Sequence, residues 1–553
     1  VPTKVATFPI TLDVRQGVRE NRTGNQILHK TYAVDSGEYG KPIGQDYTNV
    51  LLRIRKTIVQ DQIEAGEGNL RAAIHFRRGN RYDYTNNKWS AGIQYLTVEA
   101  DPGYNAKGPR PRLGNVKSTF LFDGEIATLN SGGASAFDIA GGNVKRYSAK
   151  IYTVKPGSNI VRLKNRVDAA KIKVGRWHIV GSYDQQVGGF PPNMRYFDYV
   201  KVAAVSGDTV TLDRRIRHLH RDNFFEKPLN SNSMGVARII PIDVGGAGGL
   251  APRNDARLTI RETFKDIEFV KNPSTRNKSN VVMYIGGALD ASFENCVMPR
   301  PVPGFVQHMR YFGGTMETSE PDKLIETLIY DGVTAGETVE GTGVELLLVR
   351  NSRTGPMKIS PRQLRAINST FDATTDTYLW YPIGWAYFGP ILSAEFQGAT
   401  FRINPTNADT RVMPGMGPAS LTIGRDASWS GSRLIIPIDS RAFQNWEVWL
   451  FEGMIITAGR ASPNWGVVRT LSSPPDGSAT WVDIQWMAGT KPTQGTLYAN
   501  RAHSLSLDAK SKLDGRSRWG RGSGGFMRQK VPPSFGPYSY DFPAGYPASD
   551  YGF

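Results

Sequence analysis

The chain has 553 residues, of which 67 are lysine or arginine and 50 are aspartate or glutamate, so its net charge is +17. Hydrophobic residues make up 39% of the chain, a share too large for a disordered protein. No stretch approaches the roughly 18 consecutive apolar residues that a membrane-spanning helix needs. The single cysteine, Cys296, excludes an intrachain disulfide and a thiolate metal cluster. With 59 glycines and 34 prolines, the composition favours a large all-β chain of several domains.

The positive charge favours an acidic partner, and the three classes to weigh are nucleic acid, anionic lipid and acidic polysaccharide. Nucleic acid is the weakest of the three, because no recognised binding motif or lysine-rich tail accompanies the charge. The excess is mostly arginine scattered through β-structure. A solvated surface with no special partner is therefore the alternative.

A helix is expected at 49–64 (NVLLRIRKTIVQDQIE), after an N-terminal segment of mixed composition, 1–48. Its apolar residues recur at nearly helical spacing; they are Leu51, Leu52, Ile54, Ile58 and Ile63. A short amphipathic helix would cover the open end of a stack of strands, where the first coil otherwise exposes unpaired edges and apolar core. We therefore assign 49–149 to a capping helix and the first coils.

The two strands after this helix resemble a known family. The first has the pattern I-H-F-x-x-G-x-x-Y from Ile74 to Tyr82, and the second reads YLTVEADPG (95–103). This order resembles the start of pectate-lyase-like right-handed parallel β-helix proteins, a superfamily of polysaccharide lyases, some glycoside hydrolases and phage tailspikes. The resemblance covers residues 45–130 and 255–425.

The chain departs from this family's usual pattern at two places. Arg78 and Gly79 replace a Pro-Gly turn, and Glu99 and Ala100 replace a glycine. The matching motifs are therefore specific for architecture and hardly specific for chemistry. The resemblance implies an extracellular or virion-associated protein that acts on polysaccharide.

Two stretches read as modules inserted into the stack. Residues 150–245 contain strands with alternating apolar residues and a tight Ser-Gly-Asp turn at 206–208. Residues 431–505 repeat this order, with Asp476 and Gly477 at the turn. Both resemble the small β-barrel insertions of other β-helix proteins, and chance similarity between hairpins is the alternative.

The central stretch, assigned as 246–430, carries one short segment five times. Each copy has a large apolar residue, a turn-former and another apolar residue, and the copies recur at intervals of about 27 to 38 residues. They are FKDIEF (264–269), FENCVM (293–298), LIYDGV (328–333), INSTF (367–371) and FQGATF (396–401), with turn-formers Asp266, Asn295, Asp331, Ser369 and Gly398. Strands that cannot bury their apolar faces alone indicate a solenoid, here a right-handed parallel β-helix. A β-sandwich or a propeller is the alternative.

The C-terminal segment, 506–553, is basic and glycine-rich at first, and its last twenty residues are aromatic and nearly uncharged. Six Tyr and Phe side chains there offer large areas to bury, and a second subunit is the simplest surface to receive them. Tailspike-type β-helix proteins use such segments in trimers, so the resemblance implies a homotrimer.

No strong enzymatic motif occurs in the sequence, and we expect neither a cofactor nor a bound metal. His218 and His220 form an H-x-H pair on a strand of the first module. A metal site needs a third ligand that the sequence does not show. A solvated strand face is therefore the expected environment of this pair.

Two sets of residues are candidates for catalysis. Asp266, Glu268 and Glu294 place carboxylates on successive coils, and paired carboxylates cleave glycosidic bonds by hydrolysis. The expected loop at 304–314 places a cation and two possible bases together, namely Arg310, His308 and Tyr311. Such a set suits the β-elimination of a uronate, in which the cation neutralises the carboxylate and the base removes the C5 proton.

An aromatic run at 378–388 (YLWYPIGWAYF) is the candidate substrate-binding segment. Sugar rings stack their C–H faces on exposed aromatic rings, so Trp380, Trp385 and Tyr387 would form subsites. Burial in a coil or a subunit interface is the alternative. The sequence thus predicts a β-helix protein that binds and cleaves an acidic polysaccharide by hydrolysis or elimination; a non-catalytic structural or receptor-binding β-helix is the other candidate.

Overall fold

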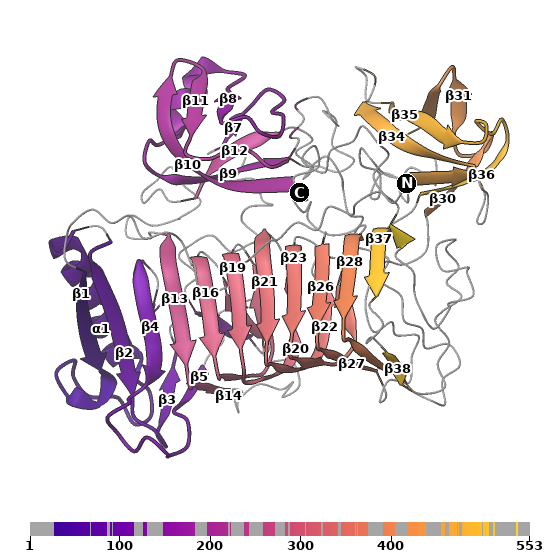
Figure 1. Ribbon diagram of the computed structural model, residues 1–553. Coiled ribbons are helices and arrows are strands. Elements are labelled where there is room, and N and C mark those ends of the chain that lie inside the picture. The colour runs from indigo at the N-terminus through magenta and orange to yellow at the C-terminus, as the bar shows by residue number, and fades with distance from the viewer. Residues whose placement is uncertain are drawn as a thin grey trace.

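Three parallel sheets, A, B and C, coil around one axis in the computed structural model of the chain (Figure 1). In the part of the chain that the structure describes, sheet A has the strand order β1-β2-β4-β13-β16-β19-β21-β23-β26-β28-β37-β39. Every neighbouring pair is parallel except the last, β37 and β39. The prediction of a parallel β-helix is confirmed, and a β-sandwich or propeller is excluded by this register.

The strands of sheet A are β1 (Leu28–Ala33), β2 (Leu70–Phe76), β4 (Tyr95–Ala100), β13 (Thr259–Lys265), β16 (Ala288–Glu294), β19 (Val306–Phe312), β21 (Ile325–Asp331), β23 (Val344–Arg350), β26 (Gln363–Ile367), β28 (Ile391–Gln397), β37 (Ala502–Leu507) and β39 (Tyr538–Ser539). Those of sheet B are β3 (Arg81–Tyr84), β5 (Arg112–Asn115), β14 (Glu268–Val270), β17 (Val297–Met298), β20 (Thr315–Ser319), β22 (Thr334–Glu340), β24 (Arg353–Thr354), β25 (Met357–Ile359), β27 (Thr370–Ala373), β29 (Thr400–Ile403) and β38 (Lys512–Asp514). Sheet C contains β6 (Glu125–Leu129), β15 (Val282–Ile285) and β18 (Pro301–Pro303).

The structure describes residues 27–66, 68–85, 89–90, 92–115, 125–129, 148–182, 196–218, 220, 222, 237–242, 258–270, 282–285, 288–304, 306–321, 324–340, 344–359, 361, 363–373, 391–403, 419–437, 455–458, 464–472, 474, 478–499, 502–507, 512–514 and 538–539. Within these ranges, no helix is both long and apolar enough to cross a membrane. The aromatic tail lies outside them apart from β39.

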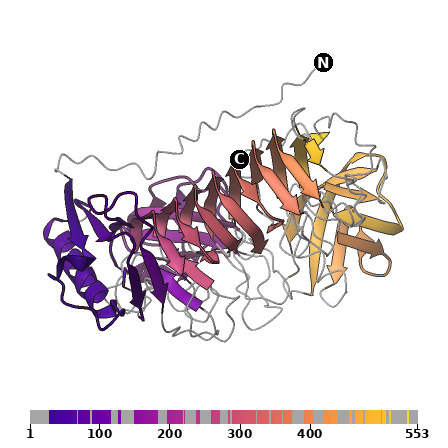
Figure 2. The same ribbon diagram turned by 90° about the horizontal axis from the view of Figure 1, so that it is seen from below.

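The helix predicted at the N-terminal end is confirmed as α1 (Thr48–Glu64), which lies at one end of the β-helix (Figure 2). Val50, Leu51, Ile54 and Ile58 are buried and join the same core as the coils. Ile63 is exposed instead. The buried set is spaced by three and four residues, so one stripe of the helix faces the core.

The corner between sheets A and B is made by a residue with positive φ in successive coils. These residues are Asp266, Asn295, Gly313, Gly332, Asn351, Asn368 and Gly398. Only Gly, Asn and Asp adopt this conformation readily, which explains why the sequence repeats them. Two of the predicted turn-formers, Asp331 and Ser369, are one residue from the true corner. Gly313 and Asn351 mark two further corners that the five-segment pattern misses.

The coils stack so closely at one corner that a side chain is excluded. Gly314 has φ +76°, and a Cβ added to it would lie 2.1 Å from the carbonyl oxygen of Cys296 on the preceding coil. Its neighbour Gly313 has φ +62°, but the nearest atom to an added Cβ is 4.0 Å away. The two glycines therefore share the left-handed conformation and differ in the space around them.

We expect Gly314→Ala to lower the melting temperature of the protein more than Gly313→Ala does. Both substitutions carry the conformational cost of alanine at positive φ, on the order of 1–2 kcal/mol. Only Gly314→Ala adds a clash with a backbone that cannot move without separating two coils. Differential scanning calorimetry of the two variants checks this. Equal melting temperatures would show that the two coils can move apart at this corner without loss of stability.

The first inserted module is an antiparallel sheet with the order β7-β12-β9-β10-β11-β8. Its strands are β7 (Ala149–Lys150), β8 (Ile160–Arg162), β9 (Trp177–Ser182), β10 (Tyr196–Ser206), β11 (Thr209–Leu212) and β12 (Arg238–Pro241). The outer strands are joined by backbone hydrogen bonds from Tyr152 N to Arg162 O (2.9 Å) and from Lys164 N to Lys150 O (2.9 Å). The sheet thus closes on itself around its own core, which includes Val161, Val180 and Val200.

This module packs against the β-helix beyond the end at which the strands of sheet A begin (Figure 1). A second buried cluster joins Trp177, Phe197 and Tyr199 of the module to Leu289 and Leu324 of the β-helix. The hydroxyl of Tyr199 also donates to the carbonyl oxygen of Leu324 at 2.8 Å. The chain enters the module after β6 and leaves it before β13, and β4 pairs directly with β13 across the insertion.

The second module is an antiparallel sheet with the order β30-β36-β33-β34-β35-β32-β31. Its strands are β30 (Ala419–Ile423), β31 (Ser428–Ser430), β32 (Arg433–Pro437), β33 (Ile455–Ala458), β34 (Trp465–Ser472), β35 (Ala479–Ala488) and β36 (Gly495–Ala499). The module begins before the predicted boundary at 431. The strand after it, β37, returns to sheet A beside β28, so the β-helix resumes within the range that the sequence assigned to the module.

Candidate functional site

Three neighbouring strands of sheet A, β13, β16 and β19, carry a charged outer face. The register places Arg261 beside Asp290 and Asp290 beside His308. Successive side chains of a strand point to opposite faces, so His308 and Arg310 point outward whereas Met309 and Tyr311 belong to the core. The sheet A charged face is defined here as Arg261, Asp290, Glu294, His308 and Arg310.

Asp290 anchors the cations of this face. Its side chain is buried, and its Oδ2 lies 2.9 Å from Nη2 of Arg310 and 3.4 Å from Nε of Arg261. The side chain of Arg310 is 14% exposed and that of Arg261 is 35% exposed. One carboxylate on β16 therefore holds two guanidinium groups from the strands on either side of it, β13 and β19, and the side chain of Arg261 remains partly exposed.

The environment of His308 keeps its imidazole in the neutral form, which can accept a proton. Burial lowers its pKa from the usual value, because desolvation disfavours the imidazolium ion; the carboxylates of Glu326 and Asp290 oppose this effect without overcoming it. The imidazole is consequently neutral at neutral pH. A neutral imidazole on the same strand face as the guanidinium group of Arg310 is a base next to an anion-binding group.

The three predicted carboxylates lie near one another at the corner between sheets A and B, and each has a cationic partner. Asp266 pairs with Arg78 at 3.0 Å, Glu268 with Arg112 at 3.4 Å, and Glu294 with Lys265 at 3.7 Å. Asp266 also accepts a hydrogen bond from the side-chain amide of Asn295. Its place in the turn gives it a structural role, whereas Glu294 ends β16 and belongs to the charged face.

Tyr311 does not belong to the site. The expected loop at 304–314 is largely strand β19, and Tyr311 is fully buried between the rings of Phe293 and Tyr330, at centroid distances of 5.7 and 5.4 Å. Burial raises the pKa of its hydroxyl well above the usual value. The side chain cannot reach a polysaccharide, so its assignment as a base is wrong. Trp380, Trp385 and Tyr387 lie outside the described residues.

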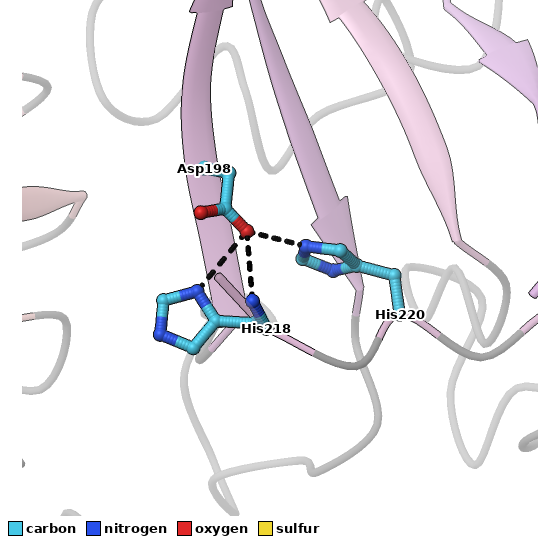
Figure 3. A group of neighbouring side chains, drawn as sticks. All are labelled: Asp198, His218 and His220. Carbon is cyan, nitrogen blue, oxygen red and sulfur yellow. Dashed lines mark hydrogen bonds and ion pairs between the residues drawn. The ribbon is translucent and has the colours of Figure 1, made fainter. Parts of the chain in front are cut away.

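A second polar cluster lies at the junction of the first module and the β-helix. Asp198 of β10 meets His218 and His220, which follow β11 (Figure 3). Oδ2 of Asp198 lies 3.1 Å from Nδ1 of His218 and 2.9 Å from Nε2 of His220. All three side chains are buried, so the expectation of a solvated strand face is wrong. Asp198 is the third polar group of this cluster, and the sequence alone does not indicate it.

This cluster continues onto the β-helix. Arg217 donates to Oδ1 of Asp198 from Nε at 3.0 Å, and its Nη1 lies 2.8 Å from Oε1 of Glu326 on β21. Nε2 of His218 lies 3.3 Å from Oε1 of Glu345 on β23. Burial alone would lower the pKa of His218, but the carboxylates of Glu345 and Asp198 outweigh it and raise the pKa.

The fold and this arrangement define the chain as a parallel β-helix protein with two antiparallel modules inserted between its coils. No protein-family model matches the chain, and no curated protein sequence matches it.

Phage tailspikes are among the solved structures that match. The gp54 tailspike of Acinetobacter baumannii bacteriophage AP22, solved in complex with A. baumannii capsular saccharide, is 11% identical; the match covers 85% of this chain and 96% of that one, with a TM-score of 0.25. The tailspike gp49 of Pseudomonas phage LKA1 is 10% identical over 82% and 92% of the two chains, with a TM-score of 0.20. The tailspike gp61 of Pseudomonas phage phi297 is 9% identical with the same coverages and TM-score.

Proposed function

We propose that this protein binds an acidic polysaccharide on the sheet A charged face and cleaves it by β-elimination. The observation that carries the proposal is the imidazole of His308 next to Asp290, whose carboxylate holds the guanidinium groups of Arg261 and Arg310 on the outer face of the sheet. A uronate unit presents a carboxylate and an acidic C5 proton at neighbouring positions. The face offers a matching cation and base.

In the proposed reaction, the guanidinium groups stabilise the negative charge that the uronate carboxylate gains as the C5–H bond breaks. His308 takes the C5 proton, the C4–C5 double bond forms, and the C4–O bond to the leaving sugar breaks. Water supplies the proton to the leaving oxygen. Asp290 acts as a positioning residue, because it holds Arg261 and Arg310 through its ion pairs.

Hydrolysis by Glu268 and Glu294 is the competing mechanism. Each of these carboxylates is held in an ion pair, Glu268 with Arg112 at 3.4 Å and Glu294 with Lys265 at 3.7 Å. A hydrolase needs two carboxyl groups that flank the scissile bond, one as the acid and one as the base or nucleophile. Elimination is therefore the better-supported mechanism, and the two leave different products.

Cleavage is tested with a panel of uronate-containing and neutral polysaccharides. We expect ultraviolet absorbance from an unsaturated product with the uronate-containing substrates only. His308→Ala should lower kcat by about 10²–10⁴-fold, the usual contribution of a general base. Because the pKa of His308 is lowered, the wild-type rate should stay constant through neutral pH and fall only in more acidic solution, as the imidazole becomes protonated.

His75→Ala is the matched control, since His75 lies on β2 of the same sheet and pairs with Glu99 away from the charged face. It should cleave like the wild type. New reducing ends without ultraviolet absorbance, lost in Glu268→Gln or Glu294→Gln, would assign hydrolysis instead. Binding without any product would leave the non-catalytic, receptor-binding function as the correct one.

The same proposal includes assembly and location. The aromatic tail at 533–553 offers large apolar rings to a neighbouring subunit, which supports a homotrimer. A β-helix that degrades polysaccharide would work outside a cell or on a virion.

A further inference from the structure

Three side chains at the junction of the first module and the β-helix offer ligand atoms of the kind that transition metals bind. The atoms are Oδ2 of Asp198, Nδ1 of His218 and Nε2 of His220, and all lie within 4.8 Å of one another. Figure 3 shows both imidazole rings directing a nitrogen at the same carboxylate oxygen. Two imidazoles and one carboxylate form a ligand set that suits Zn²⁺.

The groups behind these ligands are arranged as a second coordination shell. The other oxygen of Asp198, Oδ1, accepts hydrogen bonds from the backbone N of Arg217 at 3.0 Å and from its Nε at 3.0 Å. Glu345 faces the other nitrogen of His218, Nε2, at 3.3 Å. A carboxylate behind a histidine fixes its tautomer and raises its basicity at metal sites.

His218 thus faces a carboxylate from each of its ring nitrogens. A neutral imidazole carries one N–H and can satisfy only one of them; if Nε2–H points to Glu345, the lone pair of Nδ1 points at the anionic Oδ2 of Asp198. Satisfying both contacts takes a second proton, at one contact or the other, or a metal ion bound to Nδ1 and Oδ2. A metal ion satisfies Nδ1, Oδ2 and Nε2 of His220 at once.

We infer that Asp198, His218 and His220 bind one Zn²⁺ ion, which fixes the first module to the β-helix. The ligands belong to the module, whereas Glu345 and Glu326 reach the cluster from strands of sheet A. Metal binding would therefore hold His218 and Arg217 in the orientation that contacts the β-helix. This inference is independent of the polysaccharide-cleaving activity.

The inference is tested by isothermal titration of the chelator-treated, full-length protein with ZnCl2, with metal content measured by mass spectrometry. We expect one Zn²⁺ per chain, a higher melting temperature in zinc than in chelator, and release of protons on binding. Asp198→Asn and His220→Gln should each weaken binding by more than about 100-fold. Glu345→Gln, which removes only the outer carboxylate, should weaken it by about 10–100-fold.

His178→Gln is the matched control, because His178 is buried in the same module but contacts Lys173 and Arg176 instead of this cluster. It should bind Zn²⁺ like the wild type. If the ligand variants do not fold, the visible absorption of the wild type loaded with Co²⁺ reports whether nitrogen and oxygen ligands hold the ion. The inference is overturned if the wild type binds no stoichiometric zinc and melts equally in zinc and in chelator, or if Asp198→Asn and His220→Gln bind zinc undiminished.

Discussion

Replacing Phe293 with alanine is expected to lower the free energy of unfolding of the β-helix by about 3–5 kcal/mol. Phe293 is fully buried at the centre of the stack, with its ring parallel to that of Phe264 at 4.9 Å and next to that of Tyr311 at 5.7 Å. Neighbouring coils are joined through these rings, so the cavity cannot be filled without moving the backbone. Chemical denaturation followed by tryptophan fluorescence measures the loss.

The matched control is Tyr104→Ala. Tyr104 is 42% exposed, and its ring is contacted by the guanidinium group of Arg77 at 5.0 Å. Its removal should change the free energy of unfolding by less than about 1 kcal/mol, because a surface cation–π contact is worth no more than that. Equal losses from the two substitutions would contradict a core built on stacked rings.

Acid should destabilise the first module through His178. This side chain is fully buried, and burial lowers its pKa to about 4, although Nδ1 of His178 donates a hydrogen bond to the carbonyl oxygen of Arg176, which favours the protonated form. Unfolding restores a pKa near 6.5. Between about pH 6.5 and pH 4, His178 therefore binds a proton in the unfolded chain but not in the folded module. The stabilisation is complete above about pH 6.5, falls progressively as the pH drops from there to about 4, and is gone below that. The shift corresponds to about 3 kcal/mol.

The measurement compares the free energy of unfolding at several pH values in the wild type and in His178→Gln, which cannot take up that proton. We expect the wild type to lose about 3 kcal/mol more than the variant between about pH 7 and pH 4. His29→Gln changes an exposed histidine of β1 and should keep the full wild-type dependence on pH. Parallel curves for the wild type and His178→Gln would assign the acid sensitivity to other groups.

The β-helix is predictable from the sequence because its corners demand particular residues. Asp266, Asn295 and Gly398 stand at positive φ, so the chain must repeat a short list of amino acids there. The corner at Gly313 escaped prediction because its flanking residues read as a loop rather than as a strand. The helix α1 is predictable for a similar reason, since the spacing of its apolar residues along the sequence indicates which side of the helix is buried.

The site is less predictable because its residues meet through register and insertion. The sequence places His308 and Arg310 close together, but a loop assignment hides the alternation that sends Tyr311 into the core. Asp290 becomes important only when β16 is placed beside β19. Asp198 meets His218 through the fold of the module, and no local pattern in the sequence indicates that contact.

The only cysteine of the chain can be used to measure how often neighbouring coils of the β-helix separate. Cys296 lies under the corner at Gly314, its thiol is fully buried, and burial raises its pKa to about 12. Alkylating reagents attack thiolates, so they will spare this sulfur for as long as the coils remain stacked. Its modification rate therefore records how often the middle of the solenoid parts, without any label having to be introduced.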